Sequence, residues 1–239
     1  MKILEKDPPL AQECRRPWII VSFLYPLSSA GLMHIFIFTF GPTLLILLEM
    51  YVLRYFVFGS LIFLVVFTLV MGYGIYFLTF CVYDSSKAGT KAQEIPKMYF
   101  PDKWEVLRQY LLIFAGAAIC FWPAAGYYVY FRLTDLWFWI LTGIGVFFFP
   151  MALLSAILFD SMNELSPIFI TISIFKTFIG YIGLFLFFCV IGGFIVFVLP
   201  APSLLDFFGH AARFYLLMVL ANRLGWFYWW YKGKLGWGI

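Results

Sequence analysis

The two histidines, His34 and His210, are the residues in this sequence best suited to ligate a cofactor. We expect His34 about four residues into the first membrane-spanning helix and His210 about four residues into the last. These helices start on opposite faces of the membrane, so a rise of 1.5 Å per residue separates the two rings in depth by roughly 20 Å. One haem iron therefore cannot be held by both, although either alone could bind a haem or a quinone. The plainer interpretation is a hydrogen-bonded histidine at each helix end, with no cofactor.

Carboxylates and thiols give no further sign of a reaction. The acidic residues near the expected spans all fall at helix ends: Glu49, Asp84, Asp135, Asp160, Glu164 and Asp206. Proton-coupled transporters usually carry an ionisable group deep in a span, so this placement argues against a pump. The four cysteines have no C-x-x-C spacing, and the motifs of phosphate-binding loops, zinc proteases and serine hydrolases are absent from the sequence. We therefore expect a protein that is not an enzyme and holds no metal.

The composition identifies the environment that surrounds these residues. Hydrophobic residues make up 64% of the 239 residues and charged residues 12%, and 31 residues are phenylalanine. Soluble domains are about half apolar and about a quarter charged, so a soluble core could not cover this much apolar surface. The apolar residues form long continuous runs rather than short alternating strands. The sequence predicts an all-α fold, a polytopic integral membrane helical bundle with about six transmembrane helices.

The apolar runs divide the chain into an amino-terminal tail (1–16), a transmembrane domain (17–231) and a carboxyl-terminal end (232–239). The expected spans are 30–50, 55–82, 106–131, 135–158, 170–199 and 206–229, with a polar loop over 83–105. Residues 17–28 form either an interfacial elbow or part of a longer first helix. The tail lacks a short apolar core followed by a small-residue cleavage site, so we do not expect a cleaved signal peptide.

The basic residues predict the orientation, because Lys and Arg favour cytoplasmic loops. With the amino terminus inside, only three of the 16 Lys and Arg residues fall outside: Arg54, Arg132 and Arg213. We expect a multi-pass protein of the bacterial inner (cytoplasmic) membrane with both termini cytoplasmic. A cytoplasmic basic patch would then attract anionic lipid or an acidic partner surface, and its members are Arg15, Arg16, Lys87, Lys91, Lys97 and Lys103. Nucleic-acid binding is not predicted, because these residues are spread along loops rather than gathered on one face.

The stretch LGWFYWWYKGKLGWGI, residues 224–239, combines four tryptophans with two lysines. Indole rings favour the headgroup layer of a membrane, and lysines beside them face anionic lipid. We expect a membrane-interface anchor or, alternatively, a docking surface for another subunit, since aromatic and basic residues also dominate interfaces. Its members are Trp226, Trp229, Trp230, Lys232, Lys234 and Trp237.

Two regions carry a resemblance to a known group of proteins. The stretch MGYGIYFLTFCVYDSSKAGTKAQEIP, followed by DKWEVLRQYLLIF, resembles a family of uncharacterised bacterial polytopic membrane proteins that are loosely similar to Yip-type proteins. The stretches FPMALLSAILFDSMNELSPIFITISIFKTFIGY and RFYLLMVLANRLGWFYWWYKGKLGW resemble its later spans and its end. The resemblance covers roughly residues 20–237 and implies a fold of several helices with no established activity. It transfers no catalytic residue.

Together these features favour a non-enzymatic accessory or scaffolding subunit that contacts membrane lipids and other integral membrane subunits. A transporter or channel for a small or lipid-like substrate is the alternative, because prolines interrupt three spans. A quinone- or haem-associated electron-transfer subunit is the third hypothesis, for which ligands are scarce. A polar cavity at mid-depth would favour transport, whereas a broad apolar face would favour the subunit.

Overall fold

The structure, a computed structural model, describes residues 18–52, 55–56, 58–89, 92, 103–159, 165–199 and 207–237. Every regular element in these residues is a helix, which confirms the all-α fold. Arg15, Arg16, Lys91 and Lys97 of the expected basic patch, together with most of the 83–105 loop, lie outside the described residues.

A short elbow precedes the first long helix. It consists of α1 (Trp18–Leu24) and the 3-10 turn η2 (Tyr25–Leu27), and α2 (Ser29–Tyr51) follows it. The Ser28 hydroxyl caps α2 by accepting the Gly31 N–H at 3.2 Å, which satisfies one of the donors that a helix start leaves unpaired. The structure thus gives the elbow and not the continuous first helix.

Two helical hairpins follow. The first joins α2 to α3 (Gly59–Ser86), and the second joins α4 (Lys103–Phe131) to α5 (Leu136–Phe159). The tight turn of the second hairpin is closed by Asp135, whose Oδ1 accepts the Phe138 N–H at 3.2 Å and whose Oδ2 accepts the Tyr127 hydroxyl at 2.7 Å. This contact places the carboxylate at the start of α5, where it caps the helix.

The remaining helices are shorter or more polar than expected. The run predicted as one span over 170–199 divides at Thr177 into α6 (Pro167–Lys176), α7 (Phe178–Gly193) and the π-helical turn η5 (Phe194–Val198). The ten residues of α6 are too few to cross a membrane, so the helix able to cross covers Phe178–Val198 rather than the whole of 170–199. The last helix, α8 (Phe207–Leu235), runs six residues past the expected span.

Five helices within the described residues are long and apolar enough to cross a membrane: Ser29–Tyr51, Gly59–Ser86, Trp104–Phe131, Leu136–Phe159 and Phe178–Val198. This supports a multi-pass membrane protein. The crossing by α8 stays a prediction, because polar side chains such as Arg213, Asn222 and Arg223 make it less apolar than the other five.

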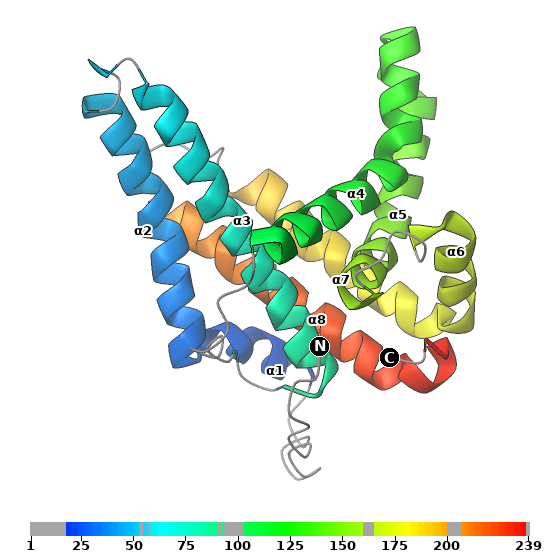
Figure 1. The fold of residues 1–239 in the computed structure, drawn as a ribbon. Coiled ribbons are helices and arrows are strands. Elements are labelled where there is room, and N and C mark those ends of the chain that lie inside the picture. The colour runs from blue at the N-terminus through cyan, green and yellow to red at the C-terminus, as the bar shows by residue number, and fades with distance from the viewer. Residues whose placement is uncertain are drawn as a thin grey trace.

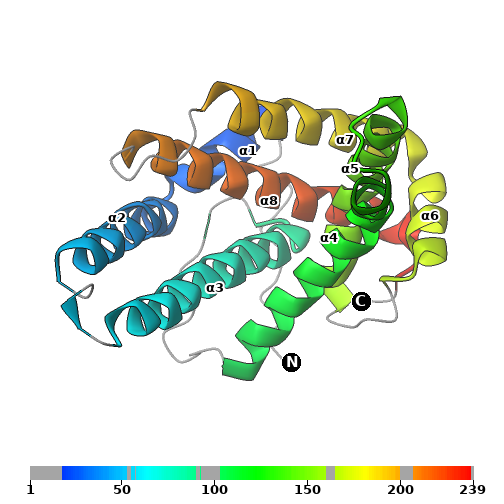
Figure 2. The same ribbon diagram turned by 90° about the horizontal axis from the view of Figure 1, so that it is seen from above.

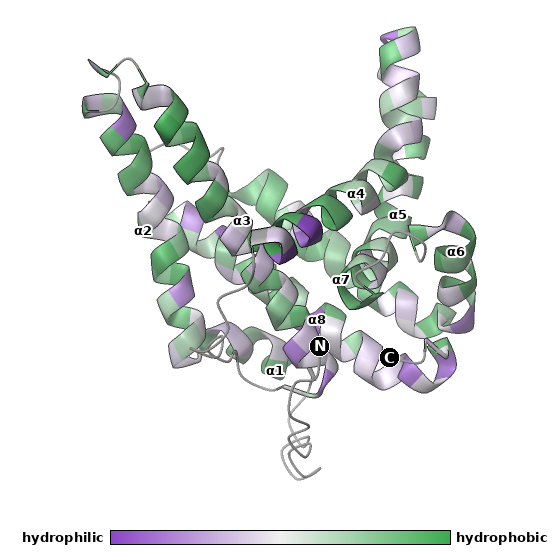
Figure 3. Cartoon of the chain, in the orientation of Figure 1, coloured by the Kyte–Doolittle hydropathy of each residue, from purple (hydrophilic) through white to green (hydrophobic). Residues whose placement is uncertain are grey.

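The two hairpins diverge as separate arms (Figure 1). Viewed from above, α7 and α8 run side by side across the molecule (Figure 2). Helix α4 bends along its length, and Pro123 supplies the cause because proline interrupts the backbone hydrogen bonds of a helix. Hydrophobic residues dominate the α2–α3 arm, and several hydrophilic residues gather around the last turns of α8 (Figure 3).

The core lies where α3, α5, α7 and α8 meet. Fully buried side chains there include Phe77, Met151, Leu184, Met218 and Leu224. A tyrosine of α7 bonds the backbone of α5. The Tyr181 hydroxyl donates to the Phe147 carbonyl, in the turn before Pro150. The bond holds α7 against α5.

Candidate functional site

The strongest candidate site is a group of polar residues buried at the end of α3. We call it the buried polar cluster, formed by Tyr25, Asp84, Ser85 and Asn222. Polar groups buried in a membrane domain are costly unless paired, and they mark function more often than surface residues do. Tyr25 of the elbow is 0% exposed, and its hydroxyl donates to Asp84 Oδ2 at 3.3 Å and lies 3.5 Å from the Cys81 carbonyl.

The cluster continues from α3 to α8. Asn222 Nδ2 donates to Ser85 Oγ at 2.8 Å, and both side chains are fully buried. Glycine at position 225 allows this approach, because a Cβ there would lie 2.3 Å from the Val82 carbonyl oxygen. The two helix backbones therefore come closer at this crossing than any side chain at residue 225 would permit.

The segment after α3 is tied to the same elbow. Ala88 adopts a left-handed conformation (φ 65°) that ends the helix, and the Gly89 N–H bonds the Asp84 carbonyl at 3.1 Å. Farther on, the Ser28 hydroxyl donates to the Ala92 carbonyl at 3.0 Å. Elbow, α3 and the start of the loop are thus held together by both backbone and side-chain bonds.

Electrostatics keep the Tyr25 hydroxyl protonated. Burial raises the pKa of Tyr25 well above its ordinary value, and the nearby acidic groups of Cys81 and Asp84 raise it further. Removing the proton would place a second negative charge beside Asp84 in a dry environment. Tyr25 therefore acts as a hydrogen-bond donor to Asp84, and this bond ties the elbow to α3.

One part of the cluster has unused hydrogen-bonding capacity. Asn222 Oδ1 is buried without a partner in the described structure, and so is the indole Nε1 of Trp226 one turn farther along α8. An acceptor and a donor at this spacing lie on the same side of a helix.

The two histidines have separate partners. His34, 3% exposed, stacks on Phe77 with ring centroids 3.7 Å apart, and its Nδ1 lies 2.8 Å from the Ala30 carbonyl oxygen. His210 Nδ1 lies 3.4 Å from an Arg213 guanidinium nitrogen. Searching the described residues for three or more His, Cys, Asp or Glu side chains placed to hold a metal ion finds none. Each ring is accounted for by contacts within the protein.

The carboxyl-terminal tryptophans divide between core and surface. Trp226 and Trp237 are each 8% exposed, so for these two rings the expected lipid-facing anchor gives way to packing within the chain. Trp237 stacks near Phe159 and Phe169, and its Nε1 donates to Ser173 Oγ at 3.1 Å. Trp229 is half-buried, whereas Trp230 is 63% exposed, and its role as an anchor or docking residue stays a prediction.

The lysines beside these rings are exposed. Lys232 and Lys234 both face outward, and the Lys234 ammonium lies 5.7 Å from the ring centroid of Tyr231. Lys87, the basic-patch member whose side chain is described, sits 4.4 Å above the Tyr83 ring. Cation–π contacts of this kind contribute about 0.5–1 kcal/mol at exposed sites. Lys103 is the first residue of α4, and the other members of the basic patch lie outside the described residues.

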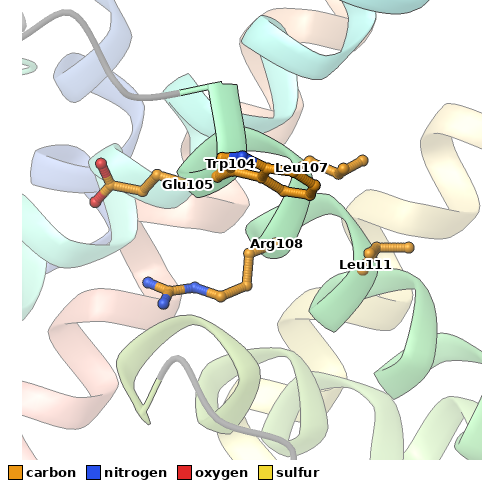
Figure 4. Close-up of a pocket in the computed structure, with 5 residues that line it drawn as sticks. All are labelled: Trp104, Glu105, Leu107, Arg108 and Leu111. Carbon is orange, nitrogen blue, oxygen red and sulfur yellow. The ribbon is translucent and has the colours of Figure 1, made fainter.

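A second candidate site lies at the start of α4. Five residues line a hollow of about 490 Å³: Trp104, Glu105, Leu107, Arg108 and Leu111. Figure 4 shows Glu105 and Arg108 extending to one side of the helix while Leu107 and Leu111 point to the other. Among the described residues, the lining combines one carboxylate, one guanidinium and apolar surface.

Sequence reasoning missed the partners in both sites. Asn222 and Ser85 lie 137 positions apart in the chain, and Tyr25 lies 59 from Asp84. Asn222 was the residue that could have indicated the cluster from sequence, because it is an amide side chain within an apolar run. No family model, curated protein or solved structure matches this chain. The resemblance to Yip-type proteins therefore stays a prediction.

Proposed function

We propose that this chain is a non-enzymatic accessory subunit of a bacterial inner-membrane complex, packed against other integral membrane proteins. One observation carries the proposal: four of the five apolar spans bury little of their length within the described chain, and α5 buries more, at 44% of its window. Only 17% of the apolar window of α3 is buried, as is 17% of that of α7, with 22% for α4 and 28% for α2. Helices in membranes associate through close side-chain packing, and this chain leaves most of that capacity unused.

The outer half of the α4–α5 arm is the best candidate for the contact surface. Its exposed side chains are large and mostly aromatic: Trp122 (73% exposed), Tyr130 (81%), Leu136 (73%), Trp137 (63%) and Trp139 (62%). Tryptophan and tyrosine dominate the energetic centres of protein interfaces. The arm stands apart from the rest of the molecule (Figure 1), which leaves its sides open to a neighbour.

Photo-cross-linking in native membranes tests this proposal. A photoreactive phenylalanine is placed at Trp137 or Trp139, and at the fully buried Phe77 as the matched control. We expect a discrete protein adduct from the two arm positions and none from residue 77. The adducted protein should also co-purify with the unmodified chain in mild detergent.

Two results would count against a subunit role. Adducts only with lipid at residues 137 and 139 would mean that the arm faces the bilayer. Protein adducts of many sizes would mean random collisions rather than one partner. Either result would favour the transporter hypothesis, which needs no protein neighbour.

A further inference from the structure

One side of α4 receives little cover from the described chain along the outer half of the α4–α5 arm. We call it the α4 outer face, and its members are Ile119 (40% exposed), Trp122 (73%), Pro123, Gly126, Val129 (65%) and Tyr130 (81%). They follow the i, i+3, i+4, i+7 and i+11 spacing of one helix face. Helix α5 covers a different side, where a Cβ at Gly145 would lie 2.7 Å from the Cys120 carbonyl oxygen.

A proline interrupts the backbone hydrogen bonds of α4 on this face. The N–H of each helical residue bonds the carbonyl four residues earlier, so Pro123 has no N–H to give the Ile119 carbonyl. At 1.5 Å per residue, this turn lies roughly 12–18 Å from the end of the helix at Phe131, well inside a hydrocarbon layer about 30 Å thick. Acyl chains offer no hydrogen-bond donor, and a backbone carbonyl without one is costly in lipid.

The same turn carries a hydrogen-bond donor. Trp122 has an indole N–H and is largely uncovered by its own chain. Tryptophan favours the headgroup layer, where its N–H finds a partner, and acyl chains provide none at this depth. Helical side chains lean toward the amino terminus, so the Trp122 ring extends toward the level of Ile119. A donor and an acceptor that lipid cannot satisfy therefore lie at one level of the α4 outer face.

We propose that the α4 outer faces of two copies of this chain pack against each other in the membrane. A two-fold axis along the membrane normal keeps the two α4 helices parallel, so equivalent residues lie at equal depth. The Trp122 indole of each copy then donates to the Ile119 carbonyl of the other. Gly126, one turn farther on, lets the helices approach, because no atom lies within 4 Å of a Cβ there. This pairing rests on the proposed role of the α4–α5 arm as a contact surface.

Disulfide trapping in native membranes tests the contact. Gly126→Cys is introduced into a chain in which serine replaces Cys14 and the exposed Cys189, and the membranes are treated with a mild oxidant. We expect a covalent dimer of twice the 27.8 kDa of one chain. The same chain without the added cysteine should give none.

Gly143→Cys is the matched control in the same arm. Gly143 is an exposed glycine of α5, and a Cβ there also meets no atom within 4 Å. It lies two residues before Gly145 and is therefore on the side of α5 turned away from α4. This variant should give no dimer. Equal amounts of dimer from positions 126 and 143 would show random collision and overturn the proposal, as would the absence of a dimer at position 126.

Two substitutions test the hydrogen bond itself. Trp122→Phe keeps an aromatic ring but removes the N–H, and Pro123→Ala gives the Ile119 carbonyl a donor within its own helix. The dissociation constant of the dimer is measured in vesicles by energy transfer between copies labelled at the amino terminus, over a range of protein-to-lipid ratios. Each substitution should raise it about tenfold, because two interhelical hydrogen bonds are lost. Trp137→Phe, on α5, should leave it unchanged.

The double variant Trp122→Phe with Pro123→Ala decides whether the two groups meet. Both substitutions remove the same bonds, so the double variant should dissociate no more than either single variant. Effects that multiply would mean that Trp122 does not contact the Ile119 carbonyl, and they overturn the proposal. If Pro123→Ala also straightens α4, Trp122→Phe decides alone, because an unchanged dissociation constant in that variant is incompatible with the bond.

The pairing and the proposed function fail separately. A foreign protein cross-linked at position 126 in place of a second copy would overturn the pairing but leave the arm as a contact surface for a larger complex. A dimer trapped at position 126, together with lipid adducts alone at positions 137 and 139, would support the pairing and count against the subunit role.

Discussion

Substituting Gly225 by alanine should weaken the crossing of α3 and α8. The new Cβ would lie 2.3 Å from the Val82 carbonyl oxygen, 2.5 Å from Ser85 Cβ and 2.8 Å from the Ser86 nitrogen. Carbon atoms in contact are about 3.5–4.0 Å apart, so the helices must separate by about 1 Å. Overpacking typically costs 1–3 kcal/mol. The backbone atoms in this contact cannot rotate away, so we expect the free energy of unfolding to fall by about 3 kcal/mol.

Gly233→Ala is the matched control on the same helix. A Cβ there meets no atom within 4 Å, and alanine in an exposed helix is about 0.5–1 kcal/mol more stable than glycine. The two substitutions add the same methyl group to α8, so their free energies of unfolding should change in opposite directions.

Thiol labelling during titration with a denaturing detergent measures both changes. Cys81 and Cys120 are 1% and 8% exposed, so they react only when the helices open. Serine replaces Cys14 and the exposed Cys189 to remove the background. We expect roughly a hundredfold or greater increase in the unfolding equilibrium constant of Gly225→Ala. A Gly225→Ala variant as stable as Gly233→Ala would refute the close crossing and the geometry of the buried polar cluster with it.

Four further outcomes are expected. Asn222→Ala should lower the free energy of unfolding by about 1 kcal/mol in the same assay, because it removes the hydrogen bond between α8 and α3. The loss is small because the substitution also removes the buried Oδ1, which has no partner in the described structure. Tyr181→Phe should lower the free energy of unfolding by about 1 kcal/mol, because it removes the hydrogen bond from α7 to the Phe147 carbonyl of α5, whereas an unchanged value would argue against that bond. The hydrogen bond from Tyr127 lowers the pKa of Asp135 in the folded protein. The ionised Asp135 carboxylate therefore stabilises the turn above about pH 4, the ordinary pKa of aspartate, and this stabilisation is lost as the pH falls through the lowered pKa. Hydrogen exchange at Phe138, referenced to the unfolded rate at each pH, should therefore rise in acid for the wild type but not for Asp135→Asn. A topology reporter fused after Ile239 or within 87–97 should read cytoplasmic, and a periplasmic signal at either place would contradict the six-span arrangement.

The positions of the long helices follow from hydropathy alone. The expected span 30–50 corresponds to α2 (Ser29–Tyr51), and 135–158 to α5 (Leu136–Phe159). Both lie between strong boundaries: Ser28 caps the first and Asp135 the second. A run of apolar residues with a capping residue at its start leaves little freedom in where a helix begins.

The division at Thr177 could not be read from the same signal. Apart from Lys176, the residues on both sides are apolar, and no proline lies at the break. The Thr177 hydroxyl donates to the Ser173 carbonyl at 2.9 Å, and the Lys176 ammonium reaches the Leu235 carbonyl oxygen at 3.4 Å. The second contact spans 59 positions. Such long-range packing decides where the chain turns, and one sequence contains no record of it.

The candidate sites were harder still to foresee. Histidine and tryptophan stand out in a sequence by their residue type, whereas the buried polar cluster exists only because particular helices cross. Ser85 and Tyr25 are common residue types, and they matter because the close approach at Gly225 brings α8 to the end of α3. Arg108 and Glu105 lie within one helical turn, so their proximity could be read from spacing, but the hollow around them could not.

The Trp237 ring has a consequence for how the protein is made. It covers Phe159 and Phe169 and bonds Ser173, which precedes it by 64 positions. Ribosomes add roughly 5–20 residues per second, so about 3 to 13 seconds pass between the synthesis of Ser173 and that of its cover. During this interval Phe159 at the end of α5 and Phe169 near the start of α6 have each other as ring partners but lack the indole that covers both. This corner of the protein is complete only once Trp237 has been made.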